Sequence, residues 1–255
     1  MKYFIIIPTY NESENLPNLI ERIFSLHSNF NIVVVDDNSP DGTGAIADTM
    51  AKEDKRIHVL HRKEKAGLGT AYVAGFKYAL TKDADYIFEM DADFSHNPEY
   101  IKDFISAISD VDLVIGSRYL HGVTIQGWSF RRLLLSKLAN IFVSRILVMP
   151  VWDFTSGFRC YKRSVLENIK LEKIRSDGYA FQIEMVYFTI QNGFSVKEIP
   201  IVFTERASGE SKISRHIVWE ALWLTFRCHA PFLKIIRTKS FFCIDTQKIF
   251  NRISK

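Results

Sequence analysis

The chain has 255 residues, enough to bury one sizeable hydrophobic core, and this length favours one α/β domain with an appendage over two independent domains. Apolar residues make up 47% and charged residues 24% of the chain, a composition that excludes intrinsic disorder. The formal net charge of +4 is too small to select an anionic partner by itself, and we expect no nucleic-acid partner.

The cysteines are far apart and show no Cys-x-x-Cys spacing, so they predict neither a disulfide framework nor a zinc site: they are Cys160, Cys228 and Cys243. A reducing, cytoplasmic setting is the simplest expectation. The apolar run at the N-terminus ends at Pro8 and is shorter than a signal-peptide core, which is typical of a buried strand. Polar residues interrupt the best apolar segment before it reaches the roughly 18 residues of a membrane-spanning helix, so we expect none.

Short runs rich in β-branched residues predict buried strands of a mostly parallel sheet at 3–7, 32–35, 57–60, 86–90 and 113–115, with a further strand at 199–203. Segments with helical spacing of apolar residues lie between them, at 16–24, 71–80 and 98–108. This alternation predicts an α/β fold with a doubly wound sheet. In such sheets ligands bind beyond the carboxyl ends of the strands, which is where polar clusters occur here: 9–12, 36–41, 91–95 and 117–119.

Two carboxylates, Asp91 and Asp93, follow the strand predicted at 86–90. Oxygen ligands at a strand end can share a hard cation with the phosphates of a substrate, and such a cation neutralises a diphosphate leaving group. The pattern therefore predicts a site for a divalent cation. The alternative is that one aspartate caps the helix that begins near Pro98 while the other is solvated.

Asp36 and Asp37 end the second predicted strand, a placement suited to accepting hydrogen bonds from a nucleoside base or ribose. The residues that follow, 38–42, also have the composition of a turn. One of the two carboxylates can therefore bind the nucleoside while the other stabilises the turn. Farther along the chain, the basic segment 206–212 is suited to closing over phosphates. Its alternative is an ordinary solvated loop.

Arginines follow the strand predicted at 113–115 and begin the next amphipathic segment. Arg118 follows the strand, and Arg131 and Arg132 begin the amphipathic segment. These arginines can converge on an acceptor phosphate, and the alternative is that they are solvated on the surface. Patterns for other chemistries are incomplete. The segment 63–70 does not complete a Gly-x-x-x-x-Gly-Lys-Ser/Thr loop, and neither a Gly-x-Gly-x-x-Gly after the first strand nor a Gly-x-Ser-x-Gly elbow occurs.

The segment 128–151 has a wide apolar face at helical spacing, opposed by Lys137, Asn140 and Ser144. This pattern is typical of a helix that lies in a membrane interface, and core packing produces the same stripe. The sequence leaves both interpretations open, and the segment 216–237 repeats the ambiguity. The apolar face consists of Leu134, Leu135, Leu138, Ile141, Phe142 and Ile146.

Five motifs occur in an order and spacing that resemble the dolichol-phosphate mannosyltransferases of glycosyltransferase family 2. They are Ile-Pro-Thr-Tyr-Asn-Glu at 7–12, Val-Asp-Asp-Asn-Ser-Pro-Asp at 35–41, Met-Asp-Ala-Asp-Phe-Ser-His at 90–96, Gly-Ser-Arg-Tyr at 116–119 and the basic segment 206–212. The resemblance covers roughly the first 215 residues. It implies a GT-A type nucleotide-binding fold and transfer of mannose from GDP-mannose to a polyprenyl (dolichyl-type) phosphate, with inversion at the anomeric carbon.

The resemblance also implies roles for individual residues. Donor contacts are expected from Pro8, Tyr10, Glu12, Val35, Asp37, Asp91, Ala92, Asp93, Arg118, Arg206 and Lys212. Asp91 and Asp93 are expected to bind Mg²⁺ or Mn²⁺. The acceptor phosphate is expected to meet Arg118, Arg131, Ser156 and Arg159, with packing as the alternative for Ser156 and Arg159. Asp153 is expected to act with Asp91, Asp93 and Arg118 in catalysis, as an orienting carboxylate.

We expect residues 1–215 to form the catalytic domain, including an interface helix near 128–150, and residues 216–255 to form a basic, amphipathic extension. These helices, or a membrane-protein partner, are expected to provide peripheral contact with the cytoplasmic face of a membrane. Three alternatives stay open. The first is another sugar nucleotide, such as UDP-glucose or a UDP-amino sugar, or a saccharide acceptor. The others are a non-catalytic nucleotide- or membrane-binding module and a nucleotidyltransferase that makes sugar nucleotides.

Overall fold

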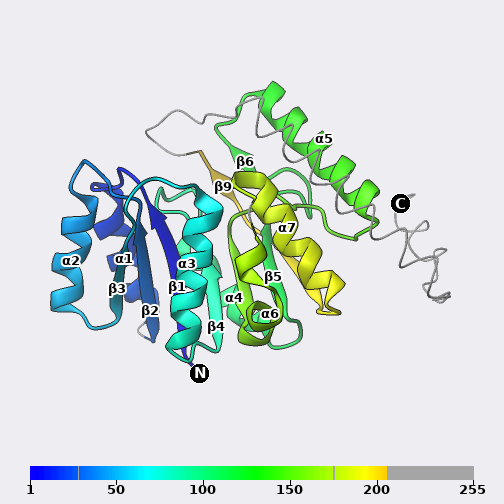
Figure 1. The fold of residues 1–255 in the computed structure, drawn as a ribbon. Helices are drawn as coiled ribbons and strands as arrows, with labels where there is room; N and C mark the ends of the chain where they lie inside the picture. The colour runs from blue at the N-terminus through cyan, green and yellow to red at the C-terminus, as the bar shows by residue number, and fades with distance from the viewer. Residues whose placement is uncertain (28, 175, 206–255) are drawn as a thin grey trace.

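The computed structural model describes residues 1–205 except Ser28 and Arg175, and this part of the chain forms a sheet covered by helices on both faces (Figure 1). Arg206, Lys212 and the extension expected at 216–255 lie outside the described residues. The strands are β1 (Tyr3–Thr9), β2 (Phe30–Asp36), β3 (Ile57–His61), β4 (Tyr86–Glu89), β5 (Leu113–Ser117), β6 (Ile125–Gln126), β7 (Arg159–Lys162), β8 (Val196–Pro200) and β9 (Phe203–Thr204). The helices are α1 (Asn15–Leu26), α2 (Thr43–Glu53), α3 (Leu68–Thr81), α4 (Ile101–Ile108), α5 (Phe130–Leu147), α6 (Arg163–Asn168) and α7 (Gly178–Gln191), with 3-10 turns η1 (Pro98–Tyr100) and η2 (Leu171–Lys173).

The main sheet has seven strands in the order β3-β2-β1-β4-β7-β5-β8, and β6 pairs with β9 in a separate small sheet. β1 pairs in parallel with β2 and β4, and β5 pairs in parallel with β8. β7 is antiparallel to both of its neighbours, β4 and β5. The sheet is therefore mostly parallel with helices on both faces, which confirms the predicted α/β class.

Residues of β1 alternate between the two faces of the sheet, as expected of a strand that is buried on both sides. Phe4 and Ile6 belong to the apolar cluster that contains residues of α3, α6 and α7, whereas Ile5 and Ile7 belong to the cluster that contains residues of α1, α2 and α4. Figure 1 shows α3, α6 and α7 in front of the sheet. Because helices cover both faces, the carboxyl ends of the strands are the place where polar groups can meet a ligand.

The sequence pattern missed several elements, among them β7 and α2, and it merged two others. β7 begins at Arg159 and ends at Lys162, so charged residues conceal a strand whose arginine is fully buried. The inner face of α2 consists of small side chains and gives no apolar stripe at helical spacing. The strand predicted at 199–203 is the end of β8 and the start of β9, which belong to different sheets.

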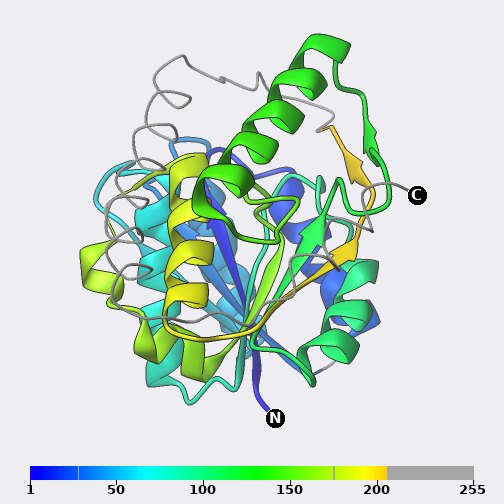
Figure 2. The same cartoon turned by 90° about the vertical axis from the view of Figure 1, so that its right-hand side faces the viewer.

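α5 occupies most of the segment in which the sequence predicts an amphipathic helix, and it runs along the upper end of the molecule in Figure 2. Its buried residues are Asn140, Val143 and Leu147. Most of the predicted apolar face points away from the protein, with Leu135 68% and Leu138 52% exposed. Phe142, at the far end of the same face, packs against the core, so only the first part of the stripe is free of core packing. Within the described residues, no helix combines the length and the apolar character that crossing a bilayer requires.

Gly75 provides a test of how α3 packs on β1. A Cβ atom at this position would lie 2.2 Å from Cγ2 of Ile6. We expect Gly75→Ala to lower the free energy of unfolding by about 1–2 kcal/mol, because overpacking outweighs the gain in helix propensity. Urea unfolding measures the change, and Lys77→Ala on the exposed side of the same helix is the control, with an expected change below about 0.5 kcal/mol. An unchanged midpoint for Gly75→Ala would contradict this packing.

Candidate active site

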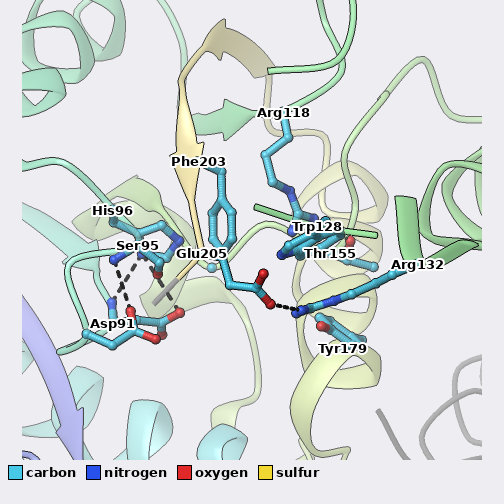
Figure 3. Close-up of a pocket in the computed structure, with 12 residues that line it drawn as sticks. Asp91, Ser95, His96, Arg118, Trp128, Arg132, Thr155, Tyr179, Phe203 and Glu205 are labelled. Atoms are coloured by element: carbon cyan, nitrogen blue, oxygen red, sulfur yellow. Dashed lines mark hydrogen bonds and ion pairs between the residues drawn. The ribbon is translucent and has the colours of Figure 1, made fainter. Parts of the chain in front are cut away.

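A pocket at the carboxyl ends of β4 and β5 gathers charged side chains of both signs (Figure 3). Its walls come from segments that are far apart in the sequence: the turn after β4, the segment that leads into α5, the loop before β7, the start of α7 and the strand β9. Its acidic side chains are Asp91, Asp93 and Glu205, and its arginines are Arg118 and Arg132.

The turn after β4 carries Asp91 and Asp93. Oδ1 of Asp91 accepts a hydrogen bond from the hydroxyl of Tyr72 at 3.1 Å. Burial, together with the nearby carboxylates, raises the pKa of Tyr72 well above its usual value, so this hydroxyl stays protonated and remains a donor. Oδ1 of Asp93 accepts the backbone N–H of Ser95 at 3.1 Å, and Phe94 between them has a φ of 58°. Local hydrogen bonds thus hold the backbone that presents the two carboxylates.

Ser95 and His96 complete this wall of the pocket. Ser95 is 3% exposed, and its Oγ has no hydrogen-bond partner within the described residues. His96 is 1% exposed, and its Nδ1 accepts the backbone N–H of Asp91 at 3.2 Å. Burial lowers the pKa of His96, which favours the neutral ring that can accept a hydrogen bond. The hydroxyl of Ser95 adds a hard oxygen to a wall that already holds two carboxylates.

Arg118 and Asp153 form a buried ion pair at the pocket. The arginine side chain is 5% exposed and the aspartate side chain is fully buried. Nε of Arg118 lies 2.7 Å from Oδ2 of Asp153, and Nη2 lies 2.7 Å from Oδ1, so the pair is bidentate. Burial by itself would raise the pKa of Asp153, but the charge and hydrogen bonds of Arg118 outweigh this effect and lower the pKa. Asp153 is therefore an ionised partner that orients Arg118.

Two partners hold the loop that contains Asp153. Glu198 of β8 accepts the backbone N–H groups of Trp152 and Asp153, each at 2.8 Å. Asn140 of α5 accepts the backbone N–H of Phe154 at 2.8 Å. The ion pair is thereby connected to the sheet through β8 and to the helix α5.

Rings and guanidinium groups alternate along the side of the pocket that leads into α5. The guanidinium of Arg118 lies 5.6 Å from the ring centroid of Trp128 and 5.5 Å from that of Phe203. The guanidinium of Arg132 lies 4.0 Å from the Trp128 centroid and forms an ion pair with Glu205. Figure 3 shows Arg132 and Glu205 pointing toward each other. These contacts fix two positive charges beside the acidic wall.

A second polar cluster lies at the ends of β1 and β2. Asp37 is buried, and its Oδ1 lies 2.8 Å from Nη1 of Arg62. Burial raises the pKa of Asp37, although Arg62 and the backbone N–H of Ala66 oppose this effect. Nζ of Lys65 lies 3.8 Å from the ring centroid of Tyr10, which follows β1. A carboxylate and an aromatic face are groups that can hydrogen-bond to and stack on a nucleoside base.

Pro8 and Glu12 lie on either side of Tyr10 in the sequence, at the end of β1. Pro8 is within the strand, and Oε2 of Glu12 accepts a hydrogen bond from the side-chain amide of Asn15 at 2.8 Å. The backbone N–H of Glu12 donates to Oγ1 of Thr43 at 3.0 Å, which ties this segment to the start of α2. The donor contacts of Pro8 and Glu12 stay predictions.

Ser156 and Arg159, which the sequence analysis assigns to the acceptor site, are instead buried structural residues. Oγ of Ser156 donates to the carbonyl of Gly116 at 2.6 Å. The guanidinium of Arg159 donates to the carbonyls of Ser156, Phe154 and Gln182 at 2.7–2.9 Å. Because backbone carbonyls occupy these donors in the interior, the structure corrects the prediction for both residues.

Three further predictions change in detail. Arg131 is exposed, and its neighbour Arg132 lines the pocket instead, because successive residues of a helix point about 100° apart. The side chains of Val35 and Ala92, expected at the donor, belong to the two core clusters. Their side chains therefore pack in the core, and any donor contact from these two residues would use the backbone.

Several residues of the pocket were not proposed from the sequence. Ser95 and His96 are within the motif at 90–96, so their position beside the aspartates was a usable signal. The others come from separate segments that no local pattern connects, and only tertiary structure brings them to the acidic turn. They are Trp128, Thr155, Gly157, Tyr179, Phe203 and Glu205.

The family model described as Glycosyl transferase family 2 matches residues 4–170, more than half of the chain. The chain belongs to glycosyl transferase family 2. The match covers the elements from β1 to α6, including the turn with Asp91 and Asp93 and the position of Arg118. This result confirms the family that the sequence motifs indicate.

Two curated relatives of this family 2 member match most of both chains. Polyprenol monophosphomannose synthase of Mycolicibacterium smegmatis is 49% identical, over 86% of this chain and 83% of the relative. Undecaprenyl-phosphate mannosyltransferase of Micrococcus luteus is 44% identical, over 87% of this chain and 91% of the relative. With the family match, these similarities establish that the chain is a glycosyltransferase.

Solved structures of glucosyl-3-phosphoglycerate synthase from Mycobacterium tuberculosis have a similar fold. The complex with Mn²⁺, UDP-glucose and phosphoglyceric acid aligns with a TM-score of 0.66 at 15% identity, over 90% of this chain and 80% of that chain. The complex with UDP alone gives a TM-score of 0.65 at the same identity. At this level of identity the likeness concerns the fold, and it confirms the GT-A type architecture of this family 2 glycosyltransferase.

The buried ion pair gives a test of how the site is held. We expect Asp153→Asn to lower the free energy of unfolding by about 3–5 kcal/mol, because the charge of Arg118 would stay buried without its carboxylate. The matched control is Glu167→Gln, which breaks the more exposed pair with Arg163 and should cost less than about 0.5 kcal/mol. Urea unfolding at pH 7 measures both variants. Similar small losses for the two would show that Arg118 does not depend on Asp153.

Proposed function

We propose that this glycosyltransferase moves mannose from GDP-mannose to a polyprenyl phosphate, with inversion at the anomeric carbon. The observation that carries the proposal is that Asp91 and Asp93 line the same pocket as Arg118 and Arg132. Carboxylates suit a cation-bound diphosphate, and guanidinium groups suit an acceptor phosphate. The 49% identity to a polyprenol monophosphomannose synthase supports this choice of sugar and acceptor.

Asp91 and Asp93 would hold Mg²⁺ or Mn²⁺. The groups present fit such an ion, because two carboxylates and the buried hydroxyl of Ser95, which has no partner among the residues that the structure describes, are hard oxygen donors. A bound ion would supply neutralisation of charge on the diphosphate leaving group. The contribution of the protein is to hold the carboxylates in place, through the hydroxyl of Tyr72 and the hydrogen bonds within the turn.

The acceptor phosphate is already an anion, so its attack on the anomeric carbon needs no strong general base. Asp153 is unsuited to that role, because it is fully buried and Arg118 lowers its pKa, which makes the carboxylate a weak proton acceptor. We propose that Arg118 and Arg132 donate N–H groups to the phosphate and fix its direction of attack. Glu205, the present partner of Arg132, would have to yield to the phosphate. Positioning and charge neutralisation then provide most of the rate enhancement.

The nucleoside of the donor is proposed to bind at the ends of β1 and β2, where Asp37 offers a carboxylate and Tyr10 an aromatic face. Pro8 and Glu12 would flank this position. Arg206 and Lys212, outside the described residues, are proposed to bind the diphosphate. In support, Glu205, the residue before Arg206 in the sequence, lines the pocket. The division into a catalytic domain at 1–215 and an extension at 216–255 is part of the same proposal.

A transfer assay with sugar-labelled GDP-mannose, a short polyprenyl phosphate and Mn²⁺ tests this function. We expect a labelled lipid product that disappears with EDTA. Asp93→Asn should lower the rate at least about 100-fold, because it removes charge at the proposed metal site. Asp103→Asn, on the exposed side of α4, makes the same chemical change away from the pocket and should keep the wild-type rate.

Other outcomes of this assay would point to the alternatives. Transfer only from UDP-glucose or a UDP-amino sugar would replace the donor, and transfer only to a saccharide would replace the acceptor. Neither transfer nor metal-dependent binding of any sugar nucleotide would indicate a non-catalytic module. Release of pyrophosphate from a nucleoside triphosphate would indicate a nucleotidyltransferase.

We also propose that the protein is peripheral on the cytoplasmic face of a membrane and docks there through α5. The helix presents large apolar side chains outward, with Phe130 76% exposed, and Arg131 and Arg145 are exposed beside them. An apolar face bordered by basic residues suits a bilayer with anionic lipids. The apolar patch, α5 with the segment after it, consists of Phe130, Leu134, Leu135, Leu138, Ile141, Val148 and Trp152.

Sedimentation with vesicles that contain anionic lipid tests the docking surface. We expect Leu135→Glu with Leu138→Glu to weaken vesicle binding more than about 10-fold, because two large apolar side chains no longer enter the bilayer. Ala45→Glu with Thr49→Glu adds the same charge to exposed positions of α2, at the opposite end of the molecule in Figure 1, and should leave binding nearly unchanged. Equal losses of vesicle binding in the two variants would indicate that added negative charge weakens binding wherever it lies on the protein. No loss in either variant would favour a membrane-protein partner.

A further inference from the structure

The side chain of His96 folds back along the chain and binds the backbone of Asp91, one of the two residues proposed to hold the metal. Its Nδ1 accepts the N–H of Asp91 at 3.2 Å across five residues of sequence, and the same nitrogen lies 3.9 Å from Oδ2 of Asp91. This hydrogen bond closes the turn between the end of β4 and η1 into a ring. The peptide that leads into Asp91 therefore has a fixed direction.

The turn needs such support because its backbone is not in a relaxed conformation. Phe94 has a φ of 58°, in the left-handed region that residues other than glycine rarely adopt. Oδ1 of Asp93 accepts the N–H of Ser95 and holds the second half of the turn. His96 holds the first half through Asp91. Each carboxylate of the pair is thus attached to a separately fixed part of the turn.

The imidazole ring of His96 is itself fixed by its neighbours. It stacks on the ring of Phe158 with centroids 5.1 Å apart, and it meets the edge of Phe203 at 5.9 Å. The backbone of His96 also forms a β-bridge with Phe203, the first residue of β9. A ring held on two sides and 1% exposed keeps its Nδ1 directed at the same donor.

The hydrogen bond also determines where the proton of the ring resides. Nδ1 accepts an N–H, so it carries no proton, and the neutral ring must carry its proton on Nε2. Histidine is suited to this place because it combines an acceptor with a flat aromatic ring that contacts both Phe158 and Phe203. An aliphatic side chain would fill the space without accepting a hydrogen bond.

We propose that His96 is a positioning residue, whose Nδ1 holds the peptide of Asp91 so that Asp91 and Asp93 present their carboxylates to one divalent cation. The inference rests on the proposed function, since it explains what supports the metal pair of that function. Groups that orient metal ligands in this way typically change metal affinity 10- to 100-fold when they are removed. A residue that only fills space would have no such specific effect.

Two substitutions separate positioning from packing. His96→Asn places an amide oxygen near the position of Nδ1 and keeps an acceptor for Asp91, but it loses the ring. His96→Leu fills more of the buried space and has no acceptor. Positioning predicts that the Asn variant binds metal better than the Leu variant, and packing predicts the opposite order.

The experiment is a titration of Mn²⁺ against the full chain with saturating GDP, with free Mn²⁺ measured by electron paramagnetic resonance. We expect the affinity of His96→Asn to stay within about 3-fold of wild type and that of His96→Leu to fall about 10- to 100-fold. His58→Leu removes a ring that stacks on Phe4, away from the pocket, and should leave the affinity unchanged. Urea unfolding of each variant gives its stability independently of the metal.

Wild-type affinity in His96→Leu, or equal losses in the Asn and Leu variants, would overturn the positioning role. If His96→Leu does not fold, His96→Gln takes its place with the same expectation, because it carries its amide near Nε2 rather than Nδ1. Failure of the wild type itself to bind Mn²⁺ with GDP would instead overturn the proposed metal site. The two failures are therefore distinguishable.

Discussion

The ion pair of Arg118 and Asp153 is the interaction on which the arrangement of the pocket depends. A guanidinium that is 5% exposed has lost most of its hydration, and without a carboxylate at bidentate distance its burial would be too costly. Asp153 must therefore be held where Arg118 requires it. Glu198 and Asn140 do this by accepting backbone N–H groups from the loop that carries Asp153. One positive charge at the pocket thus depends on contacts from both β8 and α5.

The same contacts explain why α5 presents its apolar side outward. Arg132, Ser136 and Asn140 are spaced four residues apart, so they form one row on the helix. Arg132 lines the pocket, Ser136 hydrogen-bonds to the hydroxyl of Tyr119 at 2.7 Å, and Asn140 holds the loop before β7. Since the polar row faces the protein, leucines such as Leu138 have to face away. The first half of the helix is therefore oriented opposite to a surface helix that buries an apolar stripe, whereas Val143 and Leu147 in its second half are buried.

The strand ends were predictable, whereas the contacts across the pocket were not. Asp91 and Asp93 follow an apolar strand of a parallel sheet, and local pattern alone places them at its carboxyl edge. The choice of Arg132 over Arg131 depends on how α5 is rotated, which contacts such as that of Asn140 with Phe154 determine. Arg159 was misassigned because its partners are backbone carbonyls, and no side-chain pattern in the sequence encodes those.

The ion pair of Arg132 and Glu205 connects the two substrates of the proposed reaction. Arg132 belongs to α5, the helix proposed to meet the membrane, and Glu205 follows β9 and precedes the segment proposed to bind the donor diphosphate. A guanidinium has a limited number of donors, so an acceptor phosphate at Arg132 competes with Glu205 for them. Arrival of the lipid phosphate would then release Glu205.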